Sequence, residues 1–226
     1  MIIETKHNQT TISKEVSLKG VGLHTGKEVD LTFSPSEANT GYIFKRTDLD
    51  GQPTIKADIG YVSSTDRGTC LKNDNVIIQT CEHVLASLVG LEIDNVLIKL
   101  NASEPPIMDG SSKYFVEALE KAGIKKLNKK RKEYVVNKVI SFKDEKSGSD
   151  ITVIPSENYK LTTMVDFGTK ILGTQNASIE SLSDFKNDIS KCRTFSFLHE
   201  IEMLLNKGLI KGGDLNNAIV YVDKPL

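Results

Sequence analysis

Alternating apolar and polar residues in the first part of the chain predict short strands. The pattern covers residues 11–18, 28–33 and 41–46, and Gly, Pro, Ser and Asn residues separate these segments. The motif Gly-Val-Gly-Leu-His-Thr-Gly at 20–26 lies between the first two strands. Its three glycines favour a tight, irregular backbone over a helix. A further short strand is predicted at 76–78.

Helical patterns follow in the next part of the chain. The segment from Thr80 to Gly90 is mostly apolar and predicts a short buried helix, with the threonine as its cap and the glycine at its end. A strand is predicted at 94–100. The proline-containing segment 104–110 is typical of a rigid extended loop that ends in a turn. Apolar residues at helical spacing then predict a second helix over 112–123.

The second half of the chain repeats this order of strands followed by helices. Strands are predicted at 134–142, 151–155, 161–166 and 216–222, and helices at 181–191 and 198–207. The two halves also end alike, because Glu-Ile-Asp-Asn-Val-Leu-Ile and Asp-Leu-Asn-Asn-Ala-Ile-Val each follow a helix that ends in glycine. This similarity agrees with a duplication, and strands grouped before helices indicate the α+β class.

A basic run separates the two halves. Residues 125–132 read Lys-Lys-Leu-Asn-Lys-Lys-Arg-Lys. Such a run is typical of a solvated connection, and we interpret it in this way; a patch that steers an anionic substrate is the alternative. The predicted domains are therefore residues 1–126 and 133–226, with 127–132 as a basic linker.

Composition narrows the classes of function. Of 226 residues, 38% are hydrophobic and 26% are charged, which is typical of a globular protein with a sizeable core. The net charge of −1 argues against a general nucleic-acid binder. Three distant cysteines without a Cys-x-x-Cys pair favour a reducing cytoplasm over a disulfide framework. No stretch approaches about 18 consecutive apolar residues and the N-terminus is polar, so we expect neither a membrane span nor a secretory signal.

The four histidines are the candidates for metal chemistry. His83 follows Glu82 on the predicted buried helix, where zinc would take a neutral imidazole and the carboxylate could accept a proton from water. An ordinary Glu-His pair at a helix N-terminus is the simpler interpretation of these two residues alone. Catalytic zinc needs about three protein ligands. His24 and His199 lie in less favourable settings, so the residues alone do not complete a zinc site.

The segment 192–197, Cys-Arg-Thr-Phe-Ser-Phe, lies between two predicted helices. Thr194 could donate a hydrogen bond to an oxyanion, and Phe195 and Phe197 could line an apolar passage. A capping threonine beside core phenylalanines is the alternative. The nearby Lys-Gly-Gly-Asp at 211–214 predicts either a ligand wall or a turn.

Together these segments resemble the UDP-3-O-acyl-N-acetylglucosamine deacetylases. The shared pieces are the glycine motif at 20–26, Asn-Thr-Gly at 39–41, Cys-Glu-His at 81–83, Gly-Leu-Glu-Ile-Asp-Asn at 90–95, Pro-Ile-Met-Asp-Gly-Ser at 106–111, Cys-Arg-Thr-Phe at 192–195 and Lys-Gly-Gly at 211–213. They lie in order and cover nearly the whole chain. The Gly-Gln-Pro-Thr-Ile segment and the chain's last residues resemble Bacteroidetes-type members, many of which carry a fused 3-hydroxyacyl-carrier-protein dehydratase domain.

The resemblance implies a cytoplasmic enzyme of lipid A synthesis. The implied reaction is zinc-dependent hydrolysis of the N-acetyl group of UDP-3-O-(3-hydroxyacyl)-N-acetylglucosamine, with release of acetate. The implied fold has two α+β domains of similar topology, each with a sheet and a helix layer, and helices packed between the outer sheets; the second domain is expected to be incomplete. The alternative is a non-catalytic module that binds a nucleotide sugar or a partner.

The resemblance also assigns roles to residues of this sequence. It implies that His83 is a zinc ligand, that Glu82 is the general base and that Thr194 stabilises the oxyanion. The implied substrate-binding residues are His24, Asp166, Phe167, Phe195, Phe197 and Gly213. The family completes its zinc site with a later His-x-x-x-Asp pair and uses a further histidine as general acid. Neither is found in these 226 residues, so we expect the chain by itself to be inactive.

Overall fold

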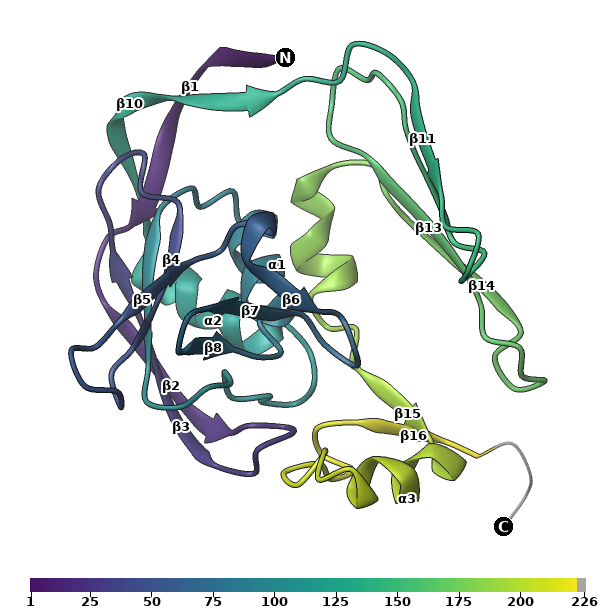
Figure 1. Cartoon of the computed structure of the whole chain (residues 1–226). Coiled ribbons are helices and arrows are strands. Elements are labelled where there is room, and N and C mark those ends of the chain that lie inside the picture. The colour runs from purple at the N-terminus through teal and green to yellow at the C-terminus, as the bar shows by residue number, and fades with distance from the viewer. Residues whose placement is uncertain (223–226) are drawn as a thin grey trace.

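The computed structural model describes residues 1–222 and confirms the α+β class (Figure 1). The elements up to the second helix are β1 (Ile2–Ile12), β2 (Val16–Val21), β3 (Glu28–Pro35), β4 (Tyr42–Arg46), β5 (Thr54–Lys56), η1 (Ile59–Tyr61), β6 (Val62–Ser64), β7 (Cys70–Asn73), β8 (Val76–Ile78), α1 (Glu82–Gly90), β9 (Val96–Leu100) and α2 (Lys113–Ala122). The remaining elements are β10 (Ile124–Tyr134), β11 (Ile140–Lys143), β12 (Asp150–Val153), β13 (Leu161–Asp166), β14 (Thr174–Ile179), η2 (Leu182–Asp184), η3 (Phe185–Ile189), β15 (Phe195–Phe197), α3 (Leu198–Asn206) and β16 (Ile219–Tyr221).

A five-stranded sheet in the order β2-β3-β9-β4-β5 organises the first half. The β4–β9 pair is parallel and the other pairs are antiparallel. Because side chains alternate between the faces of a strand, Leu31 and Phe33 of β3 share one face, and both are fully buried. The ring of Phe33 meets Phe115 of α2 edge to face, with ring centroids 6.4 Å apart. This sheet and helices α1 and α2 enclose the main core.

The strands of the second half form smaller units. Strands β11 and β12 pair in one antiparallel ribbon, β13 and β14 in another, and β15 pairs with β16 in parallel. Figure 1 shows the two ribbons set apart from the five-stranded sheet, and most of their side chains are exposed. No helix in the described part of the chain combines the length and apolar character that crossing a membrane requires.

The basic run forms part of strand β10. Strand β10 pairs with β1 in an antiparallel ladder in which Ile12 faces Ile124 and Ile2 faces Tyr134. The ladder uses backbone groups, so the lysine side chains stay in water while their backbone is paired. The domain boundaries at 126 and 133 remain a prediction.

Several predicted elements need correction in detail. Thr80 does not cap α1, because its hydroxyl donates to the carboxylate of Glu104 and Cys81 holds the cap position. The strand predicted at 134–142 is broken between β10 and β11. The helix predicted at 181–191 is divided into the 3₁₀ helix η2 and the π-helix η3, since Ser190 N bonds to the carbonyl five residues earlier.

The end of α1 packs directly against the second half. A Cβ added at Gly90 would lie 2.1 Å from the ring of Phe185, which opens η3. No side chain therefore fits at this position without moving that ring. Nearby, the Lys186 ammonium of η3 pairs with the Glu120 carboxylate of α2. These contacts join the two halves at the C-terminal end of α1 and at α2, away from the first turn of α1.

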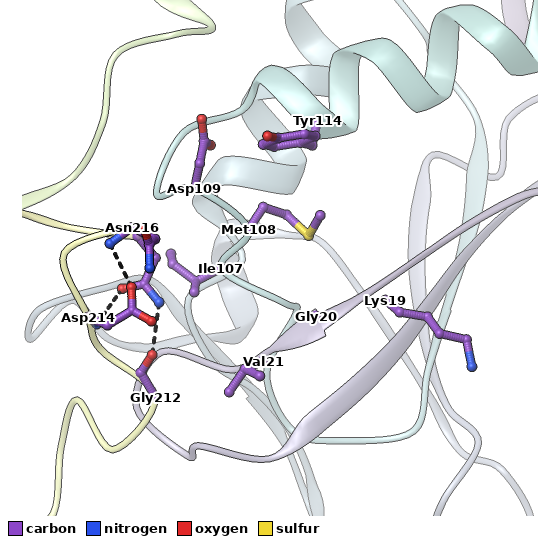
Figure 2. Close-up of a pocket in the computed structure, with 11 residues that line it drawn as sticks. Lys19, Gly20, Val21, Ile107, Met108, Asp109, Tyr114, Gly212, Asp214 and Asn216 are labelled. Carbon is purple, nitrogen blue, oxygen red and sulfur yellow. Dashed lines mark hydrogen bonds between the residues drawn. The ribbon is translucent and has the colours of Figure 1, made fainter.

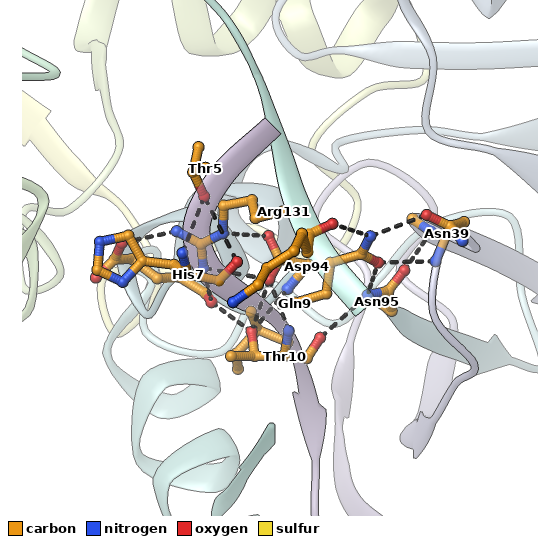
Figure 3. A network of polar contacts seen from close by, with 12 residues as sticks. Thr5, His7, Gln9, Thr10, Asn39, Asp94, Asn95 and Arg131 are labelled. Atoms are coloured by element: carbon orange, nitrogen blue, oxygen red, sulfur yellow. Dashed lines mark hydrogen bonds and ion pairs between the residues drawn. The ribbon is translucent and has the colours of Figure 1, made fainter. Parts of the chain in front are cut away.

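A polar network fixes β1 to the start of β9 (Figure 3). The Asn95 side chain accepts from the backbone N–H groups of Thr40 and Gly41 at 2.9 and 3.0 Å and donates to Gln9 Oε1 at 3.1 Å. Gln9 in turn donates to the carbonyl of Lys130 on β10. The network therefore ties the β1–β10 ribbon to the turn before β4.

Replacing Asn95 by Ala is expected to lower the free energy of unfolding by about 1–3 kcal/mol, because the N–H groups of Thr40 and Gly41 lose their buried acceptor. Urea denaturation of the complete gene product measures the change. The matched control is Asn101→Ala, since the exposed Asn101 side chain also accepts one backbone hydrogen bond, from Asp30. Equal changes in the free energy of unfolding for the two variants would contradict the claim that burial makes the Asn95 hydrogen bonds more important.

Candidate active site

The first turn of α1 presents Glu82 and His83 side by side. The Glu82 carboxylate accepts a hydrogen bond from Thr69 N at 2.9 Å, which holds one oxygen toward the loop before β7. Both side chains are partly buried. Burial lowers the pKa of His83, while the negative charges of Glu82 and Asp109 act in the opposite direction. The lowered pKa favours a neutral imidazole, which is the form that binds metals.

The loop between β9 and α2 connects this turn to Thr194. Ser112 Oγ donates to the carbonyl of His83 at 3.0 Å. Two residues earlier in the loop, the carbonyl of Gly110 accepts from Thr194 N at 2.7 Å. Arg193 Nε also donates to the carbonyl of Asp109 at 2.6 Å. One loop of the first half thus contacts both the Glu82–His83 turn and the segment that leads into β15.

Four predicted substrate-binding residues lie in or beside an aromatic cluster. Phe195 and Phe197 share one face of β15, and their ring centroids are 5.8 Å apart. Phe195 also meets Phe167 at 5.3 Å and Tyr221 of β16 at 5.5 Å. The His199 ring stacks on Phe197 at 5.5 Å. Asp166 precedes Phe167, but its carboxylate is exposed and accepts from Gly168 N.

Tyr221 and His199 also belong to this cluster, although no sequence motif indicated Tyr221 and His199 was expected only as a candidate metal ligand. Tyr221 pairs with Phe197 in the parallel β15–β16 ladder. The apolar run at 218–222 is a signal for a strand that contains Tyr221, but the partner strand could not be inferred from it. The cluster therefore depends on a pairing between segments more than twenty residues apart.

His24 lies where the glycine motif meets the second half. Its Nδ1 is 3.4 Å from Ile210 N, and its Nε2 is 3.4 Å from the carbonyl of Arg67. The adjacent Leu23 carbonyl accepts from Gly212 N at 3.0 Å. Gly213 is exposed and donates to the carbonyl of Ile210, closing a turn. The substrate contacts predicted for His24 and Gly213 remain predictions.

A cavity of about 570 Å³ lies between the end of β2, the loop before α2 and the segment before β16 (Figure 2). Figure 2 shows Asp109 and Tyr114 on one side of it and Asp214 and Asn216 on the other. Val21 and Met108 contribute apolar surface. Glu82 and His83 are not part of its lining. The cavity therefore borders the loop that carries Asp109 and does not open onto the Glu82–His83 pair.

His83 is the metal ligand that the family resemblance implies within the described residues. Among residues 1–222, no three His, Cys, Asp or Glu side chains are grouped so that they could hold a metal ion. His24 contacts Arg67 and the Ile210 backbone, and the ring of His199 stacks on Phe197. The donor set in this part of the chain is therefore too small for a complete zinc site.

Cys81 is expected to resist alkylation in the folded protein while Cys192 reacts. Burial and the nearby Glu82 charge raise the pKa of the Cys81 thiol to about 12, and its side chain is fully buried. The reactive thiolate is therefore scarce near pH 8. Cys192 is exposed and provides the internal control. Mass spectrometry after iodoacetamide treatment measures both sites. Equally rapid labelling of the two thiols would contradict the buried placement of Cys81.

Comparison with known proteins identifies the family. The model for the family described as "LpxC: UDP-3-O-acyl N-acetylglycosamine deacetylase" matches residues 9–226. The chain belongs to this deacetylase family.

The most similar relatives include two bifunctional members of the deacetylase family. The chain is 45% identical over 220 residues to the bifunctional enzyme LpxC/FabZ of Chlorobaculum tepidum, covering 97% of this chain and 47% of the relative. It is 44% identical over 218 residues to that of Bacteroides thetaiotaomicron, covering 96% and 47%. A UDP-3-O-acyl-N-acetylglucosamine deacetylase of Geobacter is 39% identical over 216 residues, covering 95% and 70%. The chain thus spans about half the length of the bifunctional relatives.

Proposed function

We propose that this chain supplies Glu82, His83 and Thr194 to an enzyme that removes the N-acetyl group from UDP-3-O-(3-hydroxyacyl)-N-acetylglucosamine in lipid A synthesis. Family membership and the deacetylase names of the relatives support this substrate. The observation that carries the proposal is the loop at 109–112, which contacts both the Glu82–His83 turn and Thr194. Groups from the two halves are thereby held on one scaffold.

In the proposed reaction Glu82 is the general base. The Glu82 carboxylate accepts a proton from a water molecule as the water oxygen attacks the acetyl carbonyl carbon. Thr69 N holds one carboxylate oxygen at 2.9 Å, which orients the group before reaction. The Thr194 hydroxyl donates to the oxygen that becomes negative. The carbon–nitrogen bond then breaks, the amine of the sugar nucleotide takes up a proton from the further histidine that the family resemblance implies as general acid, Glu82 returns its proton to water, and acetate leaves.

Zinc is part of this proposal for the complete protein. A bound zinc ion polarises a carbonyl group and lowers the pKa of water. His83 would provide one nitrogen to it, and its lowered pKa suits that role. Since the described residues hold no group of three potential ligands, the remaining ligands would come from outside them. This requirement agrees with the later His-x-x-x-Asp pair that the family resemblance implies.

The aromatic cluster is proposed to face the apolar and nucleotide parts of the substrate. Phe195 would line the acyl chain, and Phe197 and Phe167 would lie nearer the uridine and the sugar. Their edge-to-face packing at 5.3–5.8 Å gives the site a preformed apolar wall. We also propose that the complete protein is cytoplasmic and carries a dehydratase domain downstream, which fits the bifunctional relatives.

The test of the proposed function uses the complete gene product and UDP-3-O-(3-hydroxyacyl)-N-acetylglucosamine. Mass spectrometry is expected to show acetate and the free 2-amino sugar nucleotide in equal amounts. UDP-N-acetylglucosamine without the acyl chain is the matched control and is expected to react more slowly, because it does not engage the apolar wall. Binding of the UDP-sugar without any acetate release would favour the non-catalytic module instead.

Zinc binding by the 226-residue chain distinguishes the same two interpretations. A single His83 ligand predicts weak binding, because structural and catalytic zinc sites need three or four protein ligands. Isothermal titration with zinc measures the affinity. Tight one-to-one binding by this chain would contradict the assignment of His83 as its lone ligand.

A further inference from the structure

A buried carboxylate that the proposed chemistry does not use lies behind the site. Glu104 is fully buried at the start of the loop that leads to Asp109. Its oxygens accept hydrogen bonds from His24 N at 3.0 Å, Thr25 N at 3.0 Å and Thr80 Oγ1 at 2.9 Å. Burying a carboxylate is costly unless donors surround it, and bonds to a charged acceptor are strong. Glu104 is therefore a rigid junction between two segments that are distant in sequence.

The first of these segments leads directly into the Glu82–His83 turn. Thr80 has a φ of +51°, a conformation that β-branched residues rarely adopt. Its hydroxyl bond to Glu104 offsets part of that strain and fixes the residue two positions before Glu82. Because α1 begins at Glu82, the direction in which its first turn projects depends on this anchor.

The second segment is the loop that carries His24. A Cβ at Gly22 would lie 2.7 Å from Glu104 Oε2, so the carboxylate occupies the space of a missing side chain. The same loop meets the second half closely, since a Cβ at Gly212 would lie 2.4 Å from the carbonyl of Gly22. The backbone bond between Gly212 and Leu23 adds to this contact. The position of residues 210–213 therefore depends on the position of the loop that Glu104 holds.

We propose that Glu104 is a positioning residue for the deacetylation. It holds the turn with Glu82 and His83 and the His24 loop in one geometry, and through that loop it sets the place of the second-half segment 210–213. This inference rests on the proposed function. Displacements of about 1 Å can lower a reaction rate by about 100-fold, so loss of this anchor affects turnover without touching a reacting group.

The test compares Glu104→Gln with wild type in the complete gene product. The amide retains one acceptor but turns a donor toward the N–H groups of His24 and Thr25. We expect kcat to fall by about 10- to 100-fold with a small change in KM. Amide hydrogen exchange is expected to accelerate at residues 22–26 and 210–213. The matched control is Glu117→Gln, which replaces a half-exposed carboxylate on α2 and is expected to change neither kcat nor the exchange rates.

A second pair of variants applies if Glu104→Gln does not fold. Thr80→Ser keeps the hydroxyl and is expected to keep most of kcat, whereas Thr80→Val keeps the shape and is expected to lose about 10-fold. Wild-type kcat and wild-type exchange in Glu104→Gln, or equal kcat in the two Thr80 variants, would overturn the proposal. If the wild-type protein releases no acetate, the proposed function fails. The exchange measurement still decides whether Glu104 anchors the loop.

Discussion

Replacing Glu82 by Gln in the complete protein is expected to lower kcat for acetate release by about 100- to 10,000-fold, the usual contribution of a general base. The amide still offers an oxygen to Thr69 N, which now lies 2.9 Å from the Glu82 carboxylate. The change therefore removes the basic group while it keeps the side chain's shape and its hydrogen bond. KM is expected to change little, because no proposed substrate contact is lost.

The Glu82→Gln measurement has two controls. The unfolding temperature of the variant is expected to match that of wild type. A lower kcat would then reflect the missing base and not a disrupted structure. Glu117→Gln on α2 removes a half-exposed carboxylate whose ion pair with Lys113 spans 3.9 Å, and its kcat is expected to stay at the wild-type value. Turnover of Glu82→Gln within a few-fold of wild type would refute the assignment of the general base.

Replacing Gly110 by Ala is expected to cost about 2–5 kcal/mol of stability, from a positive φ and a close contact together. Gly110 has a φ of +85°, which an L side chain rarely adopts. The added Cβ would also lie 2.0 Å from the carbonyl oxygen of Asn217, a backbone atom that moves only with its segment. Urea denaturation of the complete gene product measures the loss.

Gly51→Ala is the matched control for Gly110→Ala. Gly51 has a φ of +72° and no atom within 4 Å of its Cβ position, so the change adds backbone strain without a clash. It is expected to cost about 1–2 kcal/mol. The difference between the two variants isolates the contact with Asn217. Equal losses would contradict the close approach of the 109–112 loop and the segment before β16. Gly110→Ala is also expected to reduce kcat, because Thr194 N bonds to the Gly110 carbonyl.

Local periodicity predicted the elements that bury one face. The helix over 112–123 is present as α2, and the strand over 94–100 is present as β9, because their apolar residues face a common core. The strand at 161–166 is also confirmed as β13, although all of its residues are exposed and its partner is β14. In α2 and β9, burial and local preference favour the same structure.

Non-local contacts explain the elements that periodicity did not reveal. Strand β10 is formed by pairing with β1, more than one hundred residues earlier in the chain, while its own side chains are mostly basic and exposed. The donors to Glu104 come from His24, Thr25 and Thr80, so its role as a junction has no local pattern. The Thr80 hydroxyl bonds to Glu104 instead of to an N–H group of α1, so the threonine cap expected from the local sequence does not form.

For the candidate site, the motifs and the family resemblance single out Glu82, His83 and Thr194 as candidates, and their roles remain predictions. The sequence did not show that Ser112 and Gly110 of one loop contact the His83 and Thr194 backbones. Such contacts depend on how the two halves meet. The sequence also could not predict the close packing at Gly110, because the Asn217 carbonyl that contacts it is more than one hundred residues later in the chain.

Zinc affinity of the complete protein with and without His83 tests the central claim most directly. Titration with zinc in a chelator buffer compares wild type, His83→Ala and, as the control, His7→Ala, which removes an exposed imidazole on β1. Loss of one of about three protein ligands is expected to weaken zinc binding by at least about 100-fold in His83→Ala, while His7→Ala keeps the wild-type affinity. Wild-type zinc affinity in His83→Ala would contradict the account.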